Sequence, residues 1–401
     1  MENRLGYYTM HCPVTFGVDA VEVLKQDVQT FGAKKVFVLY DKGVEASGIA
    51  DRVMNILKEA GVEAVGYSDL HGEPIAAQVD KAGESARKSG ADLILGVGGG
   101  VAMDTAKLVS VLMVNEGSIE DYFLSKGVFF TLKKHAPVIA ITTASGTGAE
   151  STCVAVVSDN DHNKDGVMVA CDKAIVDPGL TVTCPPGVTA NSGLDAMAHA
   201  VEAISAGEYE PMTGMGADPF STTIALEAVR LITENLEKAY DDGSDLDARI
   251  ALSKASNFAG IAFASTGVNF GHAAGHEIGA VFGLPHGLAC AYTLPLTTYK
   301  TAEFDPERGY ALARAMGCEV SESDSPEAVG KAMQDKIVGI MKNCHIPPMS
   351  EKGITRESAM ACAPDAIRHN GFYTNTIRPI PEEEFAEYIG EMYDISETLR
   401  G

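Results

Sequence analysis

The sequence has little of what marks secreted, membrane-spanning and disulfide-rich proteins. Its 8 cysteines are scattered over 401 residues without a CxxC pair, so we expect neither a disulfide framework nor a cysteine zinc site. No run of 18 apolar residues occurs, and Met1–Gly6 has no apolar signal region. We therefore expect a cytoplasmic chain that does not cross a membrane.

Basic residues are also scarce, because 31 Lys and Arg stand against 55 Asp and Glu, for a formal net charge of −24. Such a charge repels nucleic acids and anionic membranes at long range, so we predict neither as a partner. It leaves the substrate open, since a local pocket can be basic inside an acidic protein. With 46% apolar and 21% charged residues, the chain has the composition of a soluble globular protein.

The hydrophobic patterns divide the chain near Cys184-Pro185-Pro186. Before this point, short β-branched runs alternate with helical patterns, which predicts an α/β domain with a parallel sheet over residues 1–185. After it, strand patterns nearly vanish, which predicts an all-helical domain over 186–401. The predicted strands are 35–40, 62–67, 92–97 and 136–141, and the predicted helices are 50–60, 75–89, 102–114, 187–206, 214–239, 245–264, 284–302, 325–344 and 382–397.

Three consecutive glycines, Gly98, Gly99 and Gly100, follow a predicted strand and precede a predicted helix. Residues without Cβ let the backbone approach a pyrophosphate, and the helix N-terminus offers free N–H groups and a positive dipole end. The spacing is not GxGxxG, because Val101 stands where the last glycine would be. Alone, the pattern fits a dinucleotide site and an empty tight turn equally well.

Other polar residues follow the ends of predicted strands. Asp41 comes after strand 35–40, where a carboxylate can bind an adenosine ribose and repel a 2′-phosphate, although a helix cap explains one Asp as well. Thr142, Thr143 and Thr147 lie in a hydroxyl- and glycine-rich segment after strand 136–141. That segment suits phosphate or ribose contacts and also an ordinary polar turn.

The most informative segment is a helical pattern around Asp195 and His199 that is apolar on nearly every side, so the helix should be buried. The two residues are four apart and share a face. A buried carboxylate and imidazole need a partner, which is either the other side chain or a divalent metal. At this point the sequence is therefore compatible with two interpretations, a hydrogen-bonded Asp–His pair and a metal site.

Three further histidines lie within 15 residues downstream. His272 and His276 are four apart, and His286 stands between Pro285 and Gly287 in a predicted turn. One histidine would favour a structural role, but three together with the upstream pair favour a metal site. The pattern is not HExxH, because the acidic residue follows His276 directly.

In these residues the chain resembles the iron-containing (group III) alcohol dehydrogenase family. The likeness covers about residues 35 to 290 and is weaker towards the C-terminus. The matching blocks, in chain order, are Asp41; Gly98-Gly99-Gly100 with Asp104 and Lys107; Thr142-Thr143 with Gly146-Thr147; Gly193-Leu194-Asp195-Ala196 with His199; His272-Ala273-Ala274-Gly275-His276; and Leu284-Pro285-His286-Gly287.

The resemblance implies a dinucleotide-binding α/β domain beside a helical domain, with the active site in the cleft. It assigns metal binding to Asp195, His199, His272 and His286, and it places His276 near the nicotinamide without binding the metal. We interpret His276 as a proton relay. Asp41 matches the acidic residue linked with NAD. The positions matched to the dinucleotide site are Gly98, Gly99, Gly100, Asp104, Thr142, Thr143, Thr147 and Thr152.

The chain departs from the family pattern in three places. Val101 replaces a serine after the glycines, and Glu73 stands where a Pro-Asn-Pro turn has its asparagine. The segment from Lys164 to Asp177 is short, and Lys164 matches the lysine that approaches the cofactor.

We therefore expect an NAD(H)-dependent alcohol dehydrogenase or aldehyde reductase with a divalent metal, Fe²⁺ or Zn²⁺, acting on a short aldehyde such as a lactaldehyde, semialdehyde or sulfoacetaldehyde. The resemblance also implies a homodimer or larger homo-oligomer. Two alternatives are a dehydroquinate-synthase-like or polyol(-phosphate) dehydrogenase of the same architecture and a non-catalytic nucleotide-binding module. The candidate substrate-pocket residues, for which packing is an equally good explanation, are Val154, Phe263, Ser265, Thr266 and Phe270.

Overall fold

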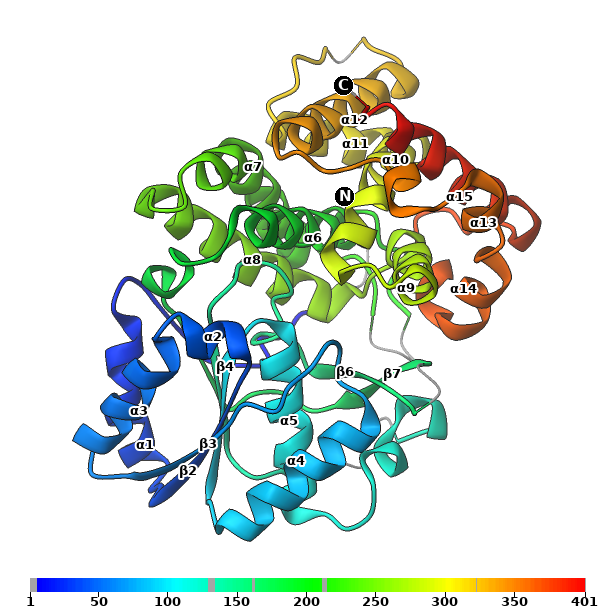
Figure 1. The fold of residues 1–401 in the computed structure, drawn as a ribbon. Coiled ribbons are helices and arrows are strands. Elements are labelled where there is room, and N and C mark those ends of the chain that lie inside the picture. Colours follow the sequence, from blue (N-terminus) through cyan, green and yellow to red (C-terminus); the bar gives the residue numbers. More distant parts are fainter. Residues whose placement is uncertain (1–5, 129–133, 161–162, 211–214, 322, 401) are drawn as a thin grey trace. The chain divides into compact units, whose positions relative to one another are not determined.

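The computed structural model describes residues 6–128, 134–160, 163–210, 215–321 and 323–400 (Figure 1). They form two compact units. The α/β unit consists of Met10–Ala144 and Gly148–Cys184. The helical unit contains the chain from Pro185 onward, together with residues 6–9 and the short segment Ser145–Thr147.

A six-stranded parallel sheet is the centre of the α/β unit, in the order β1-β8-β5-β4-β2-β3. Its two central strands, β4 and β5, are buried along their whole length, as their unbroken apolar runs require. The strands are β1 (Val14–Phe16), β2 (Lys35–Tyr40), β3 (Glu63–Tyr67), β4 (Leu93–Gly98), β5 (Val138–Thr142) and β8 (Lys173–Val176).

Helices cover both faces of this sheet, because successive side chains of a strand point to opposite faces. On one face, Val36 and Val38 of β2 pack in a core with α1 (Leu24–Thr30) and α3 (Ile49–Glu59). On the other, the intervening Phe37 packs with α4 (Ala76–Ser89) and α5 (Gly100–Val114). Figure 1 shows these two helix layers on either side of the strands.

The order in which the chain adds strands to the sheet changes direction between β2 and β4. The connection from β2 leads to β3 at one edge, and the next strand, β4, lies on the other side of β2. In open α/β sheets, ligands bind outside the carboxyl ends of the strands at such a switch point. The fold therefore has a place for a ligand at the ends of β2 and β4.

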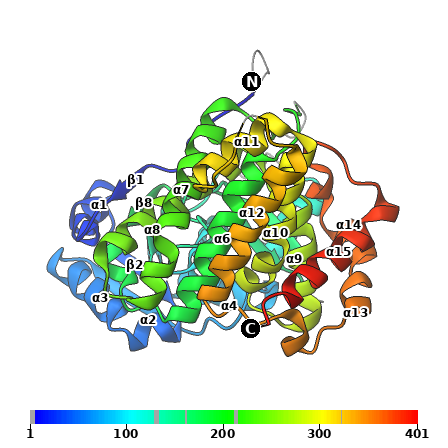
Figure 2. The ribbon, with the colours of Figure 1, turned by 90° about the horizontal axis from the view of Figure 1, so that it is seen from above.

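The helical unit is built around α6 (Pro186–Ile204), which contacts α7 (Pro219–Asp241), α8 (Leu246–Thr266) and α10 (His286–Phe304). The view in Figure 2 shows α6, α10 and α12 (Pro326–Asn343) running close together. From Leu194 to Ile204 every residue of α6 is buried, as its apolar pattern predicts. The remaining helices are α9 (Phe270–Phe282), α11 (Pro306–Ala315), α13 (Arg356–Met360), α14 (Ala363–His369) and α15 (Glu382–Glu397).

The predicted fold class is confirmed, and the predicted elements of the α/β part are present with ends shifted by at most two residues. The predicted helix 214–239 was wrong at its start: α7 begins at Pro219, because the Asp218 carboxylate caps the N–H groups of Phe220 and Ser221. Residues 211–214 lie outside the described part. The pattern also missed the helices α1, α2 (Lys42–Ala46), α9, α11, α13 and α14. Among the strands it missed β1, β8 and the antiparallel pair β6 (Val154–Ser158) and β7 (Lys164–Met168).

Among the described residues, no helix combines the length and the apolar character that crossing a bilayer requires.

Candidate functional site

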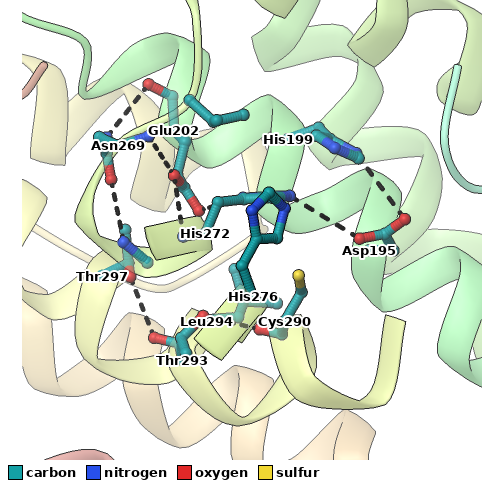
Figure 3. Close-up of polar contacts among 12 residues, drawn as sticks. Asp195, His199, Glu202, Asn269, His272, His276, Cys290, Thr293, Leu294 and Thr297 are labelled. Carbon is teal, nitrogen blue, oxygen red and sulfur yellow. Dashed lines mark hydrogen bonds and ion pairs between the residues drawn. The ribbon is translucent and has the colours of Figure 1, made fainter. Parts of the chain in front are cut away.

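The residues predicted to bind a metal meet inside the helical unit, from three helices. Figure 3 shows three of them, Asp195, His199 and His272. Asp195 and His199 lie one turn apart on α6, His272 is on α9, and His286 is the first residue of α10. Asp195, His199 and His272 are 5% exposed or less. Because α6 is surrounded by other helices, its polar side chains on this face can only point into the interior.

The Asp195 carboxylate is the centre of this group. Its Oδ1 lies 3.4 Å from Nε2 of His286 and 3.9 Å from Nε2 of His272, and its Oδ2 lies 4.0 Å from Nδ1 of His199. The rings of His199 and His272 have centroids 4.4 Å apart. The structure therefore brings all four predicted ligands together, although they come from positions up to 91 residues apart, from 195 to 286.

Buried polar atoms in this group are consistent with a bound cation. Nδ1 of His199 and Nε2 of His272 are buried and have no hydrogen-bond partner among the described residues. An unsatisfied buried acceptor or donor costs about 1–3 kcal/mol, so such atoms are usually explained by an ion or a ligand. One carboxylate with several imidazoles is a donor set that suits Fe²⁺ and Zn²⁺. The residues present thus fit a divalent metal.

Glu202 orients one of these imidazoles. Its Oε1 accepts a hydrogen bond of 2.6 Å from Nδ1 of His272, and its Oε2 accepts one of 2.5 Å from the N–H of Asn269. Glu202 is 1% exposed. With Nδ1 of His272 held in this way, Nε2 points to the Asp195 carboxylate, which is the usual arrangement behind a metal-binding histidine.

The electrostatics of the two neighbouring rings differ. Burial lowers the pKa of His199 well below its ordinary value, and the nearby His272 and His276 rings lower it further. Burial acts in the same direction on His272, but Cys290 and Glu202 outweigh it and hold the pKa of His272 well above the ordinary value. The Glu202 carboxylate therefore holds a hydrogen on Nδ1 of His272, which leaves Nε2 as the nitrogen that faces Asp195, and His199 favours its neutral form.

His276 is held by a different partner, at the end of α14. Its Nδ1 lies 3.0 Å from Oδ1 of Asn370, whose own Nδ2 donates to the carbonyl of Ala366. Since the amide nitrogen of Asn370 is engaged, its oxygen is the acceptor, and Nδ1 of His276 must carry the hydrogen. Nε2 of His276 is left as an acceptor. The ring also packs edge-on against Phe372 and lies 5.2 Å, centroid to centroid, from the His286 ring.

In the α/β unit, the glycine turn leaves open space in front of α5. Gly99 is the N-cap of α5, and no described side chain caps this end of the helix. A Cβ added to Gly99 would meet no atom within 4 Å, whereas one added to Gly98 would approach the Cβ of Ala102 to 2.7 Å. Gly98 thus serves the packing of strand on helix, and Gly99 leaves room for a group bound at the positive end of the helix.

The other predicted dinucleotide contacts on these strands lie beside this turn. Thr142 pairs with Gly98 in the sheet register, and the N–H of Thr143 donates to the Gly98 carbonyl over 3.1 Å. Asp41 follows β2, the strand next to β4, and its Oδ1 accepts from the N–H of Val44 over 2.8 Å, so it also caps α2 (Lys42–Ala46). The carboxyl ends of β2, β4 and β5 therefore gather these residues at the switch point.

Three sequence-predicted cofactor residues, Asp104, Thr152 and Lys164, have partners inside the α/β unit. Lys107 is fully buried, and its Nζ donates to Thr152 Oγ1 over 2.9 Å and lies 3.5 Å from Asp104 Oδ1. Lys164, which matches the family's cofactor lysine, forms an ion pair of 3.0 Å with Glu73, a position that departs from the family pattern. Thr147 belongs to the segment that groups with the helical unit.

Comparison with known proteins agrees with this geometry. The chain matches the family model "Iron-containing alcohol dehydrogenase" over residues 13–178 and "Fe-containing alcohol dehydrogenase family, C-terminal" over residues 189–392. The chain belongs to the iron-containing alcohol dehydrogenase family. This is a family of oxidoreductases that use a divalent metal.

Three relatives illustrate the range of this family. Long-chain-alcohol dehydrogenase 1 of Geobacillus thermodenitrificans is 34% identical over 92% of this chain and 92% of its own. A crystal structure of 1,3-propanediol oxidoreductase is 28% identical, with a TM-score of 0.89 over 97% of this chain and 100% of that one. A sulfoacetaldehyde reductase from Bifidobacterium kashiwanohense, solved in complex with NAD⁺, is 25% identical, with a TM-score of 0.83 over 98% and 99% of the two chains.

The predicted substrate-pocket residues have different surroundings. Phe263 is half-buried and stacks on the His199 ring, with centroids 4.2 Å apart. Ser265 and Thr266 are buried, and the Thr266 hydroxyl contacts the carbonyls of Ala262 and Gly267. Phe270 is 1% exposed and packs in the helical core. Phe263 is thus the predicted pocket residue that lies against a predicted metal ligand, His199. Val154 is in the α/β unit.

Sequence reasoning missed Glu202, Asn370 and Cys290 as site residues. Glu202 had a usable signal, because positions 195, 199 and 202 follow the i, i+4, i+7 spacing of one helix face. Cys290 is four residues after His286 and shares its face of α10 in the same way. Asn370 had no such signal, because it meets His276 only through the packing of α14 against α9.

Proposed function

We propose that this protein is an NAD(H)-dependent alcohol dehydrogenase or aldehyde reductase that requires a divalent metal, Fe²⁺ or Zn²⁺. The observation that carries the proposal is the convergence of Asp195, His199, His272 and His286, with buried ring nitrogens of His199 and His272 that lack partners among the described residues. Family membership supports the reaction class. The NAD⁺ complex of a related sulfoacetaldehyde reductase supports the cofactor.

The four ligands would hold the ion through one carboxylate and three imidazoles. When bound, the ion supplies a Lewis acid that polarises the substrate oxygen and stabilises its alkoxide character, a contribution of several kcal/mol. Glu202 keeps Nε2 of His272 directed at the Asp195 carboxylate through its 2.6 Å contact with Nδ1. This contact allows the ligand geometry to exist before the ion arrives.

His276 would move the proton. Asn370 fixes the hydrogen on Nδ1, so Nε2 can accept a proton from an alcohol substrate and return one to an alkoxide in the reverse direction. Four protein ligands are already present, and the substrate oxygen needs an open position, so a fifth imidazole on the ion would obstruct it. His276 is therefore better suited to proton transfer than to metal binding.

The dinucleotide would bind at the carboxyl edge of the sheet. Gly99 and the uncapped end of α5 would receive the pyrophosphate, and Asp41 would accept hydrogen bonds from the adenosine ribose and repel a 2′-phosphate. The hydride chemistry belongs to the nicotinamide, and the protein supplies its position. The substrate would be a short alcohol or aldehyde, which the relatives named for 1,3-propanediol and sulfoacetaldehyde support. The relative named for long-chain alcohols does not support a short substrate.

The test is turnover with a defined metal. The purified chain is stripped with a chelator, reloaded with Fe²⁺ or Zn²⁺, and assayed for NADH oxidation with a panel of short neutral, hydroxylated and anionic aldehydes. The proposal expects no turnover without metal and recovery after reloading. NADH binding without turnover of any aldehyde by the reloaded protein would instead support a non-catalytic nucleotide-binding module.

A further inference from the structure

The antiparallel ribbon of β6 and β7 carries three residues of the predicted cofactor and substrate sites. Val154 and Lys164 are the first residues of its two strands, and Thr152 comes two positions before β6. Ala155 and Val157 pack one face of the ribbon against α4 and α5, and Figure 1 shows α5 beside it. A two-stranded ribbon alone is marginally stable in water, so its position depends on the elements that hold it.

The outer edge of β6 is held by α5 and by the segment before α4. In an antiparallel pair, alternate residues of a strand turn their backbone groups away from the partner strand. Three alternate residues of β6 are held in this way: the carbonyl of Val154 accepts from Lys107 Nζ over 3.1 Å, the N–H of Val156 donates to Asp104 Oδ2 over 3.2 Å, and the N–H of Ser158 donates to the Pro74 carbonyl over 2.9 Å. Two of the three partners are thus side chains of α5.

Lys107 also holds the residue that leads into β6. Its Nζ donates to the Thr152 hydroxyl over 2.9 Å, and the same hydroxyl lies 2.9 Å from the carbonyl of Val154. The Lys107 side chain is fully buried. A buried ammonium group needs a counter-charge and hydrogen-bond acceptors, which Asp104, at 3.5 Å, Thr152 and β6 provide. The position of Thr152 is therefore fixed from the interior of the α/β unit.

We propose that Lys107 is a positioning residue for the dinucleotide site, acting through Thr152 and the edge of β6. This inference rests on the NAD(H) dependence of the proposed function. Lys107 is enclosed by protein, so it supports the cofactor contacts without touching the cofactor. Helix α5 begins at Gly100, directly after the proposed pyrophosphate turn, so one helix carries both the phosphate end of the site and the support of the ribbon. A shift of the ribbon along α5 would separate Thr152 from the rest of the site.

Two variants remove the ammonium group. Lys107→Met keeps a long unbranched side chain, and Asp104→Asn/Lys107→Met also removes the opposite charge, so that no unpaired charge stays buried. Lys88→Met is the control, because Lys88 is an exposed residue of α4 that pairs with Glu84. Urea unfolding reports the stability of each purified variant. NADH affinity is measured by fluorescence titration, and amide exchange of residues 153–158 by mass spectrometry.

We expect both Lys107 variants to bind NADH at least about 10-fold more weakly, which is the effect of losing one hydrogen bond to a charged group. Amides of residues 153–158 should exchange at least about 10-fold faster, with those of β4 unchanged. Lys88→Met should match wild type in both measurements. Thr152→Val separates positioning from a general loss of packing. Because Lys107 acts through Thr152, adding Lys107→Met to Thr152→Val should weaken NADH binding by less than the product of the single effects.

Wild-type NADH affinity in both Lys107 variants, or single effects that multiply in Lys107→Met/Thr152→Val, would overturn the role of Lys107 and leave the proposed function intact. Rapid exchange of the Val156 amide in wild type would overturn it without any variant, so the test does not depend on the folding of a chain with a buried substitution. Failure of wild type to bind NADH at all would contradict the proposed function itself.

Discussion

Nδ1 of His272 lies 2.6 Å from Oε1 of Glu202, and both side chains are almost completely buried. This contact ties a residue of α9 to one of α6 and determines which nitrogen of His272 faces Asp195. A Cβ added to Gly271, next to His272, would reach 2.7 Å from the same carboxylate oxygen, so the glycine is needed for the approach. The proposed metal site thus depends on a second layer of residues.

The first prediction concerns that layer. Glu202→Gln should keep a side chain of the same size but replace a charged acceptor, and metal affinity should fall by about 10–100-fold. The measurement is a Zn²⁺ titration of the stripped protein against a chelator of known affinity. Glu227→Gln, which changes a half-buried ion-pair partner of Arg230 on α7, should titrate like wild type. Unchanged Zn²⁺ affinity in Glu202→Gln would show that Glu202 only packs in the core and does not support the metal site.

The second prediction concerns the proton relay. His276→Ala should retain its metal and its NADH affinity and lose turnover by about 10²–10⁴-fold. Asn370→Leu removes the acceptor that holds Nδ1 of His276, so it should lower turnover by about 10-fold or more with little change in KM. Metal content, NADH affinity and steady-state rates are measured on the same preparations. Loss of metal from His276→Ala would place His276 among the ligands.

The third prediction separates two neighbouring glycines. Gly99→Ala should fold with stability within about 0.5 kcal/mol of wild type, since its Cβ meets nothing, but should bind NADH at least about 10-fold more weakly. Gly98→Ala should lose about 1–3 kcal/mol of stability, because its Cβ would press on Ala102. Urea unfolding and NADH fluorescence titration give both quantities. Normal NADH affinity in Gly99→Ala would show that the pyrophosphate does not bind at this turn.

The fourth prediction concerns the choice of dinucleotide. Asp41→Asn keeps an oxygen that can cap the N–H of Val44 and removes the negative charge, so the stability of α2 should change little. NADPH use should improve by about 10-fold relative to NADH, which corresponds to about 1.4 kcal/mol of lost repulsion. Ratios of kcat/KM for the two cofactors decide it. Wild type that uses NADPH as readily as NADH would refute the role given to Asp41.

Much of this account could be predicted from local sequence patterns. Periodicity reveals features that depend on neighbouring residues. Examples are the C-terminal ends of strands β2 and β4, next to Asp41 and at Gly98, and the helical spacing of Asp195 and His199. The contact of Asn370 with His276 joins residues 94 apart in sequence, and no periodicity encodes it. Short strands such as β8, of 4 residues, are held by their parallel neighbours rather than by their own pattern.

The most direct test of the central claim is the metal content of purified variants after dialysis, determined by elemental analysis alongside turnover. The account predicts stoichiometric divalent metal in wild type and His276→Ala, and loss of both metal and activity in His199→Ala and His286→Ala. Full metal occupancy in His199→Ala and His286→Ala, or full turnover by metal-free wild type, would contradict it.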